Sequence, residues 1–209
     1  MQDSKCKICR RAGIKLFLKG EKCFSPKCPL IMKPYNPGKK GRRRPRPLSE
    51  YGKELREKQK LKSWYNLGER QFKKYVKEIL DRRGGVEDAA ALLVQKLETR
   101  LDNIVYRLGF ANSRSSARQL VSHGHLYVNN KPIDIPSYQL KKGDKVSIRS
   151  HSQKKMVFQN LSTILKKHKP PLWLEVDNEK LEGKVTGLPT LEEAAPPAEI
   201  SSIFEFYSR

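Results

Sequence analysis

The sequence lacks the features that mark membrane and secreted proteins. No run of apolar residues approaches the roughly 20 that a membrane-spanning helix needs, and no amphipathic segment carries an apolar face bulky enough to anchor at a membrane surface. The N-terminus, MQDSKCKICR, has neither the apolar core of a signal peptide nor the long Arg- and Ser-rich helix of a transit peptide. We therefore expect a cytoplasmic protein.

Catalytic signatures are also missing. The sequence contains no Gly-rich loop for a phosphate or cofactor and no H-E-x-x-H motif. The histidines are few and are not arranged with a nucleophile: His123, His125, His151 and His168. We predict that the protein is not an enzyme.

Acidic residues are scarce beside basic ones. The 209 residues include 44 Lys and Arg against 22 Asp and Glu, which gives a formal net charge of +22. Residues 1–62 carry +15 (20 basic, 5 acidic) and residues 63–169 carry +12 (21 and 9), whereas residues 170–209 carry −5 (3 and 8). Such an excess opposes folding unless a polyanion neutralises it. We expect the polyanion to be nucleic acid; a soluble protein that is merely basic is the alternative.

The four cysteines are confined to residues 6–28, in the pattern C-x2-C-x13-C-x4-C: Cys6, Cys9, Cys23 and Cys28. Two close pairs separated by a short loop can bring four thiolates to the corners of a tetrahedron, as a structural zinc site requires. The residues between the pairs read as a hairpin that turns at Gly20. We predict a zinc-binding knuckle; an iron–sulfur cluster, disulfides and free thiols remain open.

Residues 33–47, KPYNPGKKGRRRPRP, interleave proline and glycine with a dense run of cations. Such a segment cannot bury apolar surface and is expected to lack structure by itself. Because its cations repel one another unless they are neutralised, we expect it to lie on RNA phosphates; a solvated linker is the alternative.

Three helices are predicted after this basic arm. The first spans residues 49–62, begins at Ser49 as the N-cap and is expected to turn three side chains inward: Leu48, Tyr51 and Leu55. The second spans residues 69–82, where apolar residues recur at helical spacing. The third opens near residue 86.

Residues 97–149 are the most informative part of the chain. A helix is predicted from Leu97 to Leu108, and a shorter helix follows, capped by Asn112 or Ser113. After Gly124 the pattern becomes strand-like, with a hairpin around Asn129-Asn130 and a last pair of strands that turns at Gly143-Asp144. The two helices are expected to expose their arginines on one basic face, beside a loop that carries two histidines.

The segment TRLDNIVYRLGFANSRSSARQLVSHGHLYVNN resembles the small RNA-binding domain of the ribosomal protein S4 family. The segments LREKQKLKSWYNLGERQF, PLWLEVD and EFYSR resemble further parts of the full-length family, and the cysteine pattern resembles its zinc-carrying bacterial version. The resemblance implies an α+β fold, in which a helical lobe built from both chain ends carries an inserted RNA-binding domain. The expected divisions are 1–47 (metal knuckle and arm), 48–97 (helical lobe), 98–162 (RNA-binding domain) and 163–209 (a segment that returns to the helical lobe).

The same resemblance implies a structural protein of the small ribosomal subunit (30S) that binds the 5′ domain of 16S rRNA early and nucleates assembly of the subunit body. It also implies contact of the acidic C-terminal segment with ribosomal protein uS5, through which the family is associated with translational accuracy. A position near the mRNA entry path beside uS3 follows from it as well, and some members repress their own mRNA.

The expected RNA contacts are many cations rather than one dominant residue. The candidates are Lys39, Lys40, Arg42, Arg43, Arg44, Arg46, Lys58, Lys60, Lys62, Arg70, Lys73, Arg100, Arg107, Arg114, Arg118, His123 and His125. Two rival functions are an enzyme with a fused module of this kind and a zinc-dependent regulator of DNA or of stalled ribosomes. The sequence outside the module is divided among the knuckle, the arm, helices and an acidic tail, which leaves no room for a catalytic domain.

Overall fold

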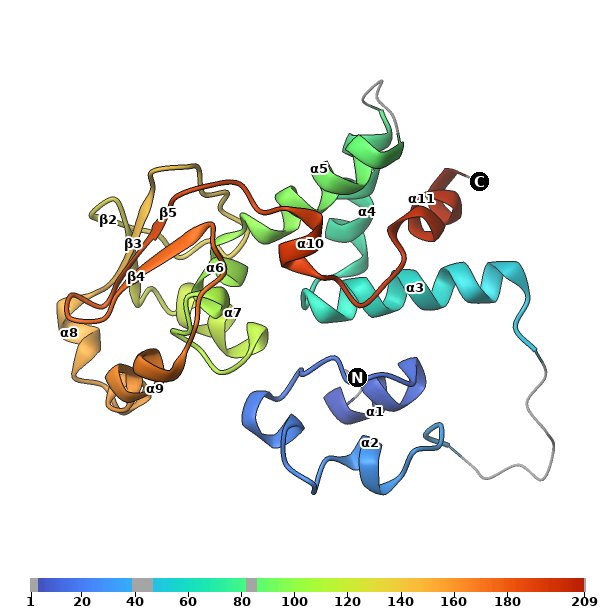
Figure 1. Cartoon of the computed structure of the whole chain (residues 1–209), viewed down its shortest axis with the longest axis horizontal. Coiled ribbons are helices and arrows are strands. Elements are labelled where there is room, and N and C mark those ends of the chain that lie inside the picture. Colours follow the sequence, from blue (N-terminus) through green and yellow to red (C-terminus); the bar gives the residue numbers. More distant parts are fainter. Residues whose placement is uncertain (1–3, 39–46, 82–85, 209) are drawn as a thin grey trace. The chain divides into compact units, whose positions relative to one another are not determined.

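The computed structural model describes residues 4–38, 47–81 and 86–208, with residues 86–88 described by their backbone alone. The chain divides into two compact units, which Figure 1 shows in colours that follow the sequence. Unit 1 comprises residues 1–90 and 196–209, and unit 2 comprises residues 91–195. Each unit is built around its own buried residues and is described separately.

Unit 1 is helical. Its elements are α1 (Lys5–Ala12), the 3-10 helix η1 (Gly20–Cys23), α2 (Pro29–Met32), α3 (Glu50–Trp64), α4 (Glu69–Leu80), the first part of α5 (Val86–Glu98) and α11 (Ile200–Ser208). The helices predicted over residues 49–62 and 69–82 are confirmed as α3 and α4. The Ser49 side chain caps α3 by accepting a hydrogen bond from the Gly52 N–H.

The predicted inner face of α3 is only partly confirmed: Leu55 is half-buried and the Tyr51 ring lies against the Phe206 ring of α11. Leu48 and Tyr51 are 42% and 54% exposed, whereas Glu54, Lys58 and Leu61 are buried. These three residues recur at helical spacing, so α3 does bury one stripe. The stripe is largely charged and lies on the same side of the helix as Tyr51 and Leu55, so apolar periodicity indicated the side but not the charged residues within it.

The hairpin predicted between the cysteine pairs is also wrong, because residues 13–22 contain turns and the start of η1 and no strand. Phe17 and Gly20 adopt positive φ values of 52° and 63°. A left-handed residue interrupts an extended strand, and two of them curl the segment around Leu16, which is buried.

Both ends of the chain build unit 1, in line with the expected helical lobe. The C-terminal helix α11 packs against α3 and α4, and Figure 1 shows it beside them. It buries three apolar side chains there: Ile200, Ile203 and Phe204. Helix α4 contributes Phe72, Val76 and Ile79 to the buried interior.

Unit 2 combines short helices with one antiparallel sheet. After the end of α5 its elements are α6 (Leu101–Arg107), α7 (Arg114–Ser122), β1 (Leu126–Val128), β2 (Lys131–Pro132), β3 (Lys145–Ile148), α8 (Ser150–Gln153), the 3-10 helix η2 (Met156–Phe158), α9 (Leu161–Lys167), β4 (Leu174–Asp177), β5 (Glu182–Val185) and α10 (Leu191–Ala194). The strand order is β2-β1-β3-β5-β4. The α+β class predicted from the sequence is confirmed.

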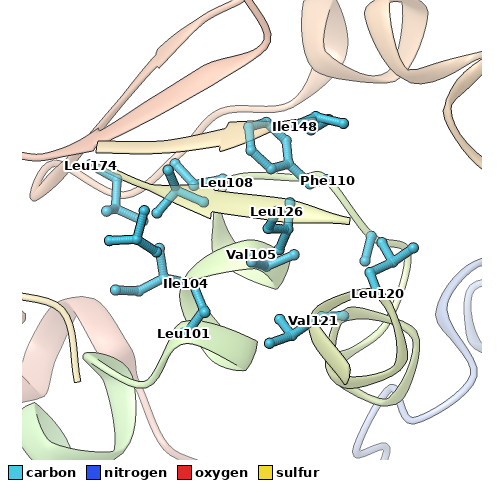
Figure 2. Packing of buried hydrophobic residues seen from close by; sticks show 14 of the residues in the cluster. Leu101, Ile104, Val105, Leu108, Phe110, Leu120, Val121, Leu126, Ile148 and Leu174 are labelled. Carbon is cyan, nitrogen blue, oxygen red and sulfur yellow. The ribbon is translucent and has the colours of Figure 1, made fainter. Parts of the chain in front are cut away.

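The core of unit 2 lies between α6, α7 and the sheet. Figure 2 shows Leu101, Ile104 and Val105 of α6, and Leu108 directly after it, gathered with residues of α7 and of the strands. Gly183 of β5 carries no side chain at the point where a Cβ would collide with Leu108. Because Leu108 is fully buried, α6 can approach β5 this closely only at a glycine.

The predicted hairpin around Asn129-Asn130 is confirmed. Both residues are left-handed, with φ values of 50° and 64°, and β1 pairs with β2 across them. The last pair of strands predicted around Gly143-Asp144 is only half present: β3 forms, but on the other side of the turn only Gln139 makes an isolated bridge, with Arg100.

The expectation that residues 163–209 all return to the helical lobe is corrected by the sheet. Strand β5 pairs with β3 and β4 pairs with β5, and Trp173, Leu174 and Val185 are buried in the core of unit 2. Only residues 196–209 belong to unit 1. The acidic segment therefore extends the sheet of the module, since its alternating apolar residues complete that core.

The helix predicted from Leu97 to Leu108 is interrupted. Helix α5 ends at Glu98 and α6 begins at Leu101. At the break, the Leu101 N–H donates to the Tyr138 carbonyl (2.8 Å) and the Thr99 carbonyl accepts from the Leu140 N–H (2.9 Å). These bonds to a distant segment replace the helical ones. In the parts of the chain that the structure describes, no helix is both long enough and apolar enough to cross a bilayer.

Candidate RNA interface

The arginine at the break between α5 and α6 is internal. Arg100 is 1% exposed, and its guanidinium donates to both carboxylate oxygens of Asp102, at 3.0 and 2.7 Å. Asp102 is buried as well. The exposed position expected for Arg100 is therefore wrong: the pair fixes the start of α6, and Arg100 acts on the interface by holding that helix.

Arg107 is held in the same way at the other end of α6. Its guanidinium donates to both oxygens of the fully buried Glu98 (2.9 and 2.7 Å) and to the Ala194 carbonyl (3.0 Å). Glu98 also accepts from the Asn103 side chain at 2.5 Å. Arg107 thus joins the end of α5 to α10 within unit 2.

The two arginines of α7 differ in exposure. Arg114 is buried, donates to the Asn103 side-chain oxygen at 2.8 Å and stacks over the Tyr106 ring at 4.6 Å. The exposed position expected for it is wrong. The Arg118 side chain is 43% exposed and lies 4.0 Å from Asp102. Of the four arginines expected on the basic face, Arg118 presents the most accessible guanidinium.

The two histidines of the loop after α7 also differ. His123 is exposed and His125 is buried, and their ring centroids lie 6.0 Å apart. His125 Nδ1 lies 3.1 Å from the Ser152 hydroxyl. Burial lowers the pKa of His125 below its ordinary 6.5, and positive charge on nearby Lys155, His123, His151 and Arg149 lowers it further.

In unit 1 the candidate lysines on α3 hold other elements. Lys58 is buried, with its ammonium 2.7 Å from Glu69 and 4.2 Å from the centre of the Phe206 ring. Lys62 donates to the other Glu69 oxygen (2.9 Å), and the Tyr207 hydroxyl donates to Glu69 at 2.9 Å. These contacts bind α11 to α3 and α4.

Three further candidates of unit 1 differ in exposure, and Lys60 is half-buried. Lys60 pairs with Glu57 one turn away. Arg70 and Lys73 are exposed on α4. The basic-arm candidates Lys39, Lys40, Arg42, Arg43, Arg44 and Arg46 lie outside the described residues.

Several exposed cations of unit 2 were not singled out by the sequence reasoning. They include three pairs of consecutive lysines, at residues 141–142, 154–155 and 166–167, all of which are exposed. Doubled lysines in short loops and helix ends are a signal that could have found them, because a buried lysine needs a partner and two adjacent ones rarely both have it.

Within the described part of the chain, no disulfide joins any of the four cysteines, which line one pocket of about 290 Å³ near α1 and η1. Cys9, Cys23 and Cys28 are buried. Burial raises the pKa of Cys9, and the other three cysteines raise it further, whereas a backbone hydrogen bond at Leu16 opposes the rise. Among the described residues, no three His, Cys, Asp or Glu side chains are arranged to hold a metal ion. The donor chemistry suits zinc, and the metal site stays a prediction.

Known proteins match almost the whole chain. Residues 1–98 match the ribosomal protein S4/S9 N-terminal domain, and residues 99–146 match the S4 domain. The small ribosomal subunit protein uS4 of Dictyoglomus turgidum is 50% identical over 204 residues, which cover 98% of this chain and 96% of the relative. The uS4 proteins of Halothermothrix orenii (47% over 204 residues) and Thermus thermophilus (45% over 205 residues) cover the same shares.

The chain belongs to the uS4 family. It is accordingly a structural component of the small ribosomal subunit that binds rRNA, and it is not an enzyme. The family predicted from the sequence is confirmed. In this chain the buried carboxylates of Asp102 and Glu98 pair with Arg100 and Arg107 inside unit 2.

Replacing Asp102 by alanine tests the internal role of Arg100. The substitution leaves a buried guanidinium without its counter-charge, so we expect the free energy of unfolding to fall by about 3–5 kcal/mol. Urea denaturation followed by circular dichroism measures it. The control is Asp134→Ala, an exposed aspartate of the same unit, which we expect to change stability by less than about 0.5 kcal/mol. Equal stabilities of the two variants would contradict the role.

A second prediction concerns Glu69 and the docking of α11. Burial alone would raise the pKa of Glu69, but hydrogen bonds from Lys58, Lys62 and Tyr207 outweigh it and lower the pKa from 4.5 to about 2. A carboxylate whose pKa is lowered by folding stabilises the fold above its unfolded pKa, and the effect is lost as the pH falls toward 2.

We therefore expect Glu69→Gln to be less stable than the native chain at pH 7, with the difference shrinking between pH 4.5 and 2. Urea midpoints across this range measure it. Glu50→Gln is the matched control, because Glu50 pairs with Lys53 but its side chain is 75% exposed. A stability difference that stays constant with pH would show that Glu69 acts by packing alone.

Proposed function

We propose that this uS4 chain is a primary rRNA-binding protein, which binds the 5′ domain of 16S rRNA early and nucleates assembly of the subunit body. The observation that carries the proposal is how the charged residues of unit 2 are divided between its surface and its interior. Residues 91–169 contain 15 basic and 4 acidic residues. Two of the four acids, Glu98 and Asp102, are buried in ion pairs with arginines. The surface of this stretch is therefore strongly cationic.

The proposed contacts follow from exposure. Arg118, Arg70, Lys73 and His123 reach solvent, and we assign them to direct contact with phosphate, together with the cations of the basic arm. Arg100, Arg107 and Arg114 with Lys58 and Lys62 act by positioning the elements that carry the others, as does the paired Lys60. Folded RNA is recognised mainly by shape and by phosphate and 2′-OH contacts, for which a rigid cationic surface is suited.

A protein partner is proposed for the acidic side of unit 2. Glu175, Asp177 and Glu179 are exposed on β4 and the turn after it, and β4 is an edge strand. Negative charge at an exposed edge disfavours RNA and favours a basic protein surface. We assign this side to ribosomal protein uS5, through which the chain would contribute to translational accuracy. A position near the mRNA entry path is part of the same proposal.

Binding to RNA is tested with the full chain and a 16S 5′-domain transcript in filter-binding titrations at several salt concentrations. A scrambled RNA of equal length serves as competitor. We expect selective binding whose affinity falls steeply with salt. Equal affinity for both RNAs would remove the support for a primary rRNA binder.

Arg118→Ala sharpens the test. We expect weaker binding to the 5′ domain, a salt slope reduced by about 1 and a stability within about 1 kcal/mol of the native chain. Lys180→Ala removes an exposed cation from the acidic region and is expected to leave the affinity unchanged. If both variants bind alike, Arg118 lies off the interface.

The zinc knuckle is proposed on the chemistry of the cysteine pocket. Cys6, Cys9, Cys23 and Cys28 would supply four thiolates, which leave no coordination position for catalysis. We expect about one zinc per chain by elemental analysis, with loss of both metal and thermal stability in Cys28→Ser. Ser25→Ala, a change in the lining of the same pocket, is the control and should keep the metal. Iron with visible absorption would indicate a cluster instead, and full stability without metal would contradict the knuckle.

A further inference from the structure

A second group of cationic side chains lies in unit 2, away from the α6 arginines. It is formed where α7 leads into β1 and where β3 leads into α8. His123 and His125 flank Gly124 in the first connection. Arg149 lies at the second, His151 is in α8, and Lys155 follows it. His151, Arg149 and Lys155 were not among the residues expected to bind RNA.

Hydrogen bonds and ring contacts hold the two connections together. The Arg149 N–H donates to the His125 carbonyl at 3.0 Å, and His125 Nδ1 meets the Ser152 hydroxyl at 3.1 Å. The His125 ring lies edge-on to Phe158 at 6.0 Å. The Arg149 guanidinium lies over the Tyr127 ring at 5.0 Å and beside Gly124. His125 therefore positions the group from within, while His123, His151 and Lys155 are exposed.

The charge of this group is of one sign. The four charged neighbours that act on His125 are all basic: Lys155, His123, His151 and Arg149. His123 lies in the α7–β1 loop, Arg149 directly follows β3, His151 lies in α8 and Lys155 directly precedes η2. The residue of η2 that contacts His125 is Phe158, which is uncharged. Like charges packed this closely repel one another unless an anion lies among them.

Arg149 adds an independent observation. Its Nε atom is buried, and no acceptor in the described part of the chain meets it. A buried donor without an acceptor is unfavourable. Guanidinium, ammonium and cationic imidazole groups in one part of unit 2 are complementary to a phosphate oxyanion.

We infer that His123, Arg149, His151 and Lys155 form a subsite for a backbone phosphate of the bound RNA, and that proton uptake by its histidines accompanies binding. The inference rests on the proposed rRNA-binding function and adds a pH dependence to it. Arg149 and Lys155 supply further positive charge to the subsite.

The direction of the pH effect follows from linkage. Histidine is the side chain that changes charge between about pH 5 and 8. A phosphate favours the cationic imidazole, so the complex holds more protons than the free protein. Affinity for RNA therefore rises as the pH falls through this range, and it levels off once the histidines are cationic in both states.

The experiment measures the affinity of the full chain for the 16S 5′-domain transcript at pH 8, 6.5 and 5.5 at constant salt. For the native chain we expect a rise on the order of tenfold, which corresponds to one unit of pKa change for one group. The double variant His123→Gln/His151→Gln is expected to match native affinity at pH 8 within about twofold and to lose most of the rise. His168→Gln, which removes a histidine outside the group, should keep it.

The outcomes separate this subsite from the proposed function. Selective binding by the native chain with no pH dependence would overturn the subsite and leave the proposed function standing. A rise that persists in the double variant would place the protons on the RNA and would also overturn it. Loss of selective binding at every pH is the failure of the proposed function itself.

Lys155→Ala adds a check that is independent of pH. The variant should reduce the salt slope of RNA binding by about 1, and an unchanged slope would count against the subsite.

Discussion

Glu98 and Asp102 bind, inside unit 2, the arginines on which the packing of α6 depends. Glu98 is fully buried and accepts from Arg107 and Asn103, while Asp102 accepts from Arg100. A guanidinium can enter a protein interior only with a counter-charge and good hydrogen-bond geometry. With these carboxylates in place, the chain places large charged side chains at the junction of α5, α6 and α10 without leaving them unsatisfied.

The same arrangement recurs in unit 1, where Glu69 gathers Lys58, Lys62 and Tyr207. In both units a carboxylate joins neighbouring elements, although Glu69 is exposed whereas Glu98 and Asp102 are buried. Each buried carboxylate is paired with an arginine, so these pairs leave the net charge of the surface unchanged. The excess of 44 basic over 22 acidic residues is therefore carried by the other side chains.

Sequence reasoning predicted α3, α4, α7 and the Asn129-Asn130 hairpin, because caps, helical periodicity and left-handed turn residues act locally. It failed where a partner far along the chain decides the outcome. The burial of Lys58 on α3 depends on Glu69, and the burial of Arg114 depends on Asn103 eleven residues earlier. The pattern of apolar residues along a helix predicts that charged residues are exposed, because it does not show which other residue they pair with. Strands β4 and β5 were assigned to the wrong lobe because a short strand does not reveal which sheet it joins.

The division of the cations into internal and external sets also bears on how RNA binding and folding are linked. Arg100 and Arg107 are already paired with buried carboxylates, so RNA changes little for them. The exposed lysines, and Arg149 with Lys155, repel one another in the free protein, and a bound polyanion removes that repulsion. Any ligand that binds only the folded chain stabilises it by mass action. The rRNA is therefore expected to stabilise chiefly the surface of the protein, while the buried ion pairs fix the shape that the rRNA meets.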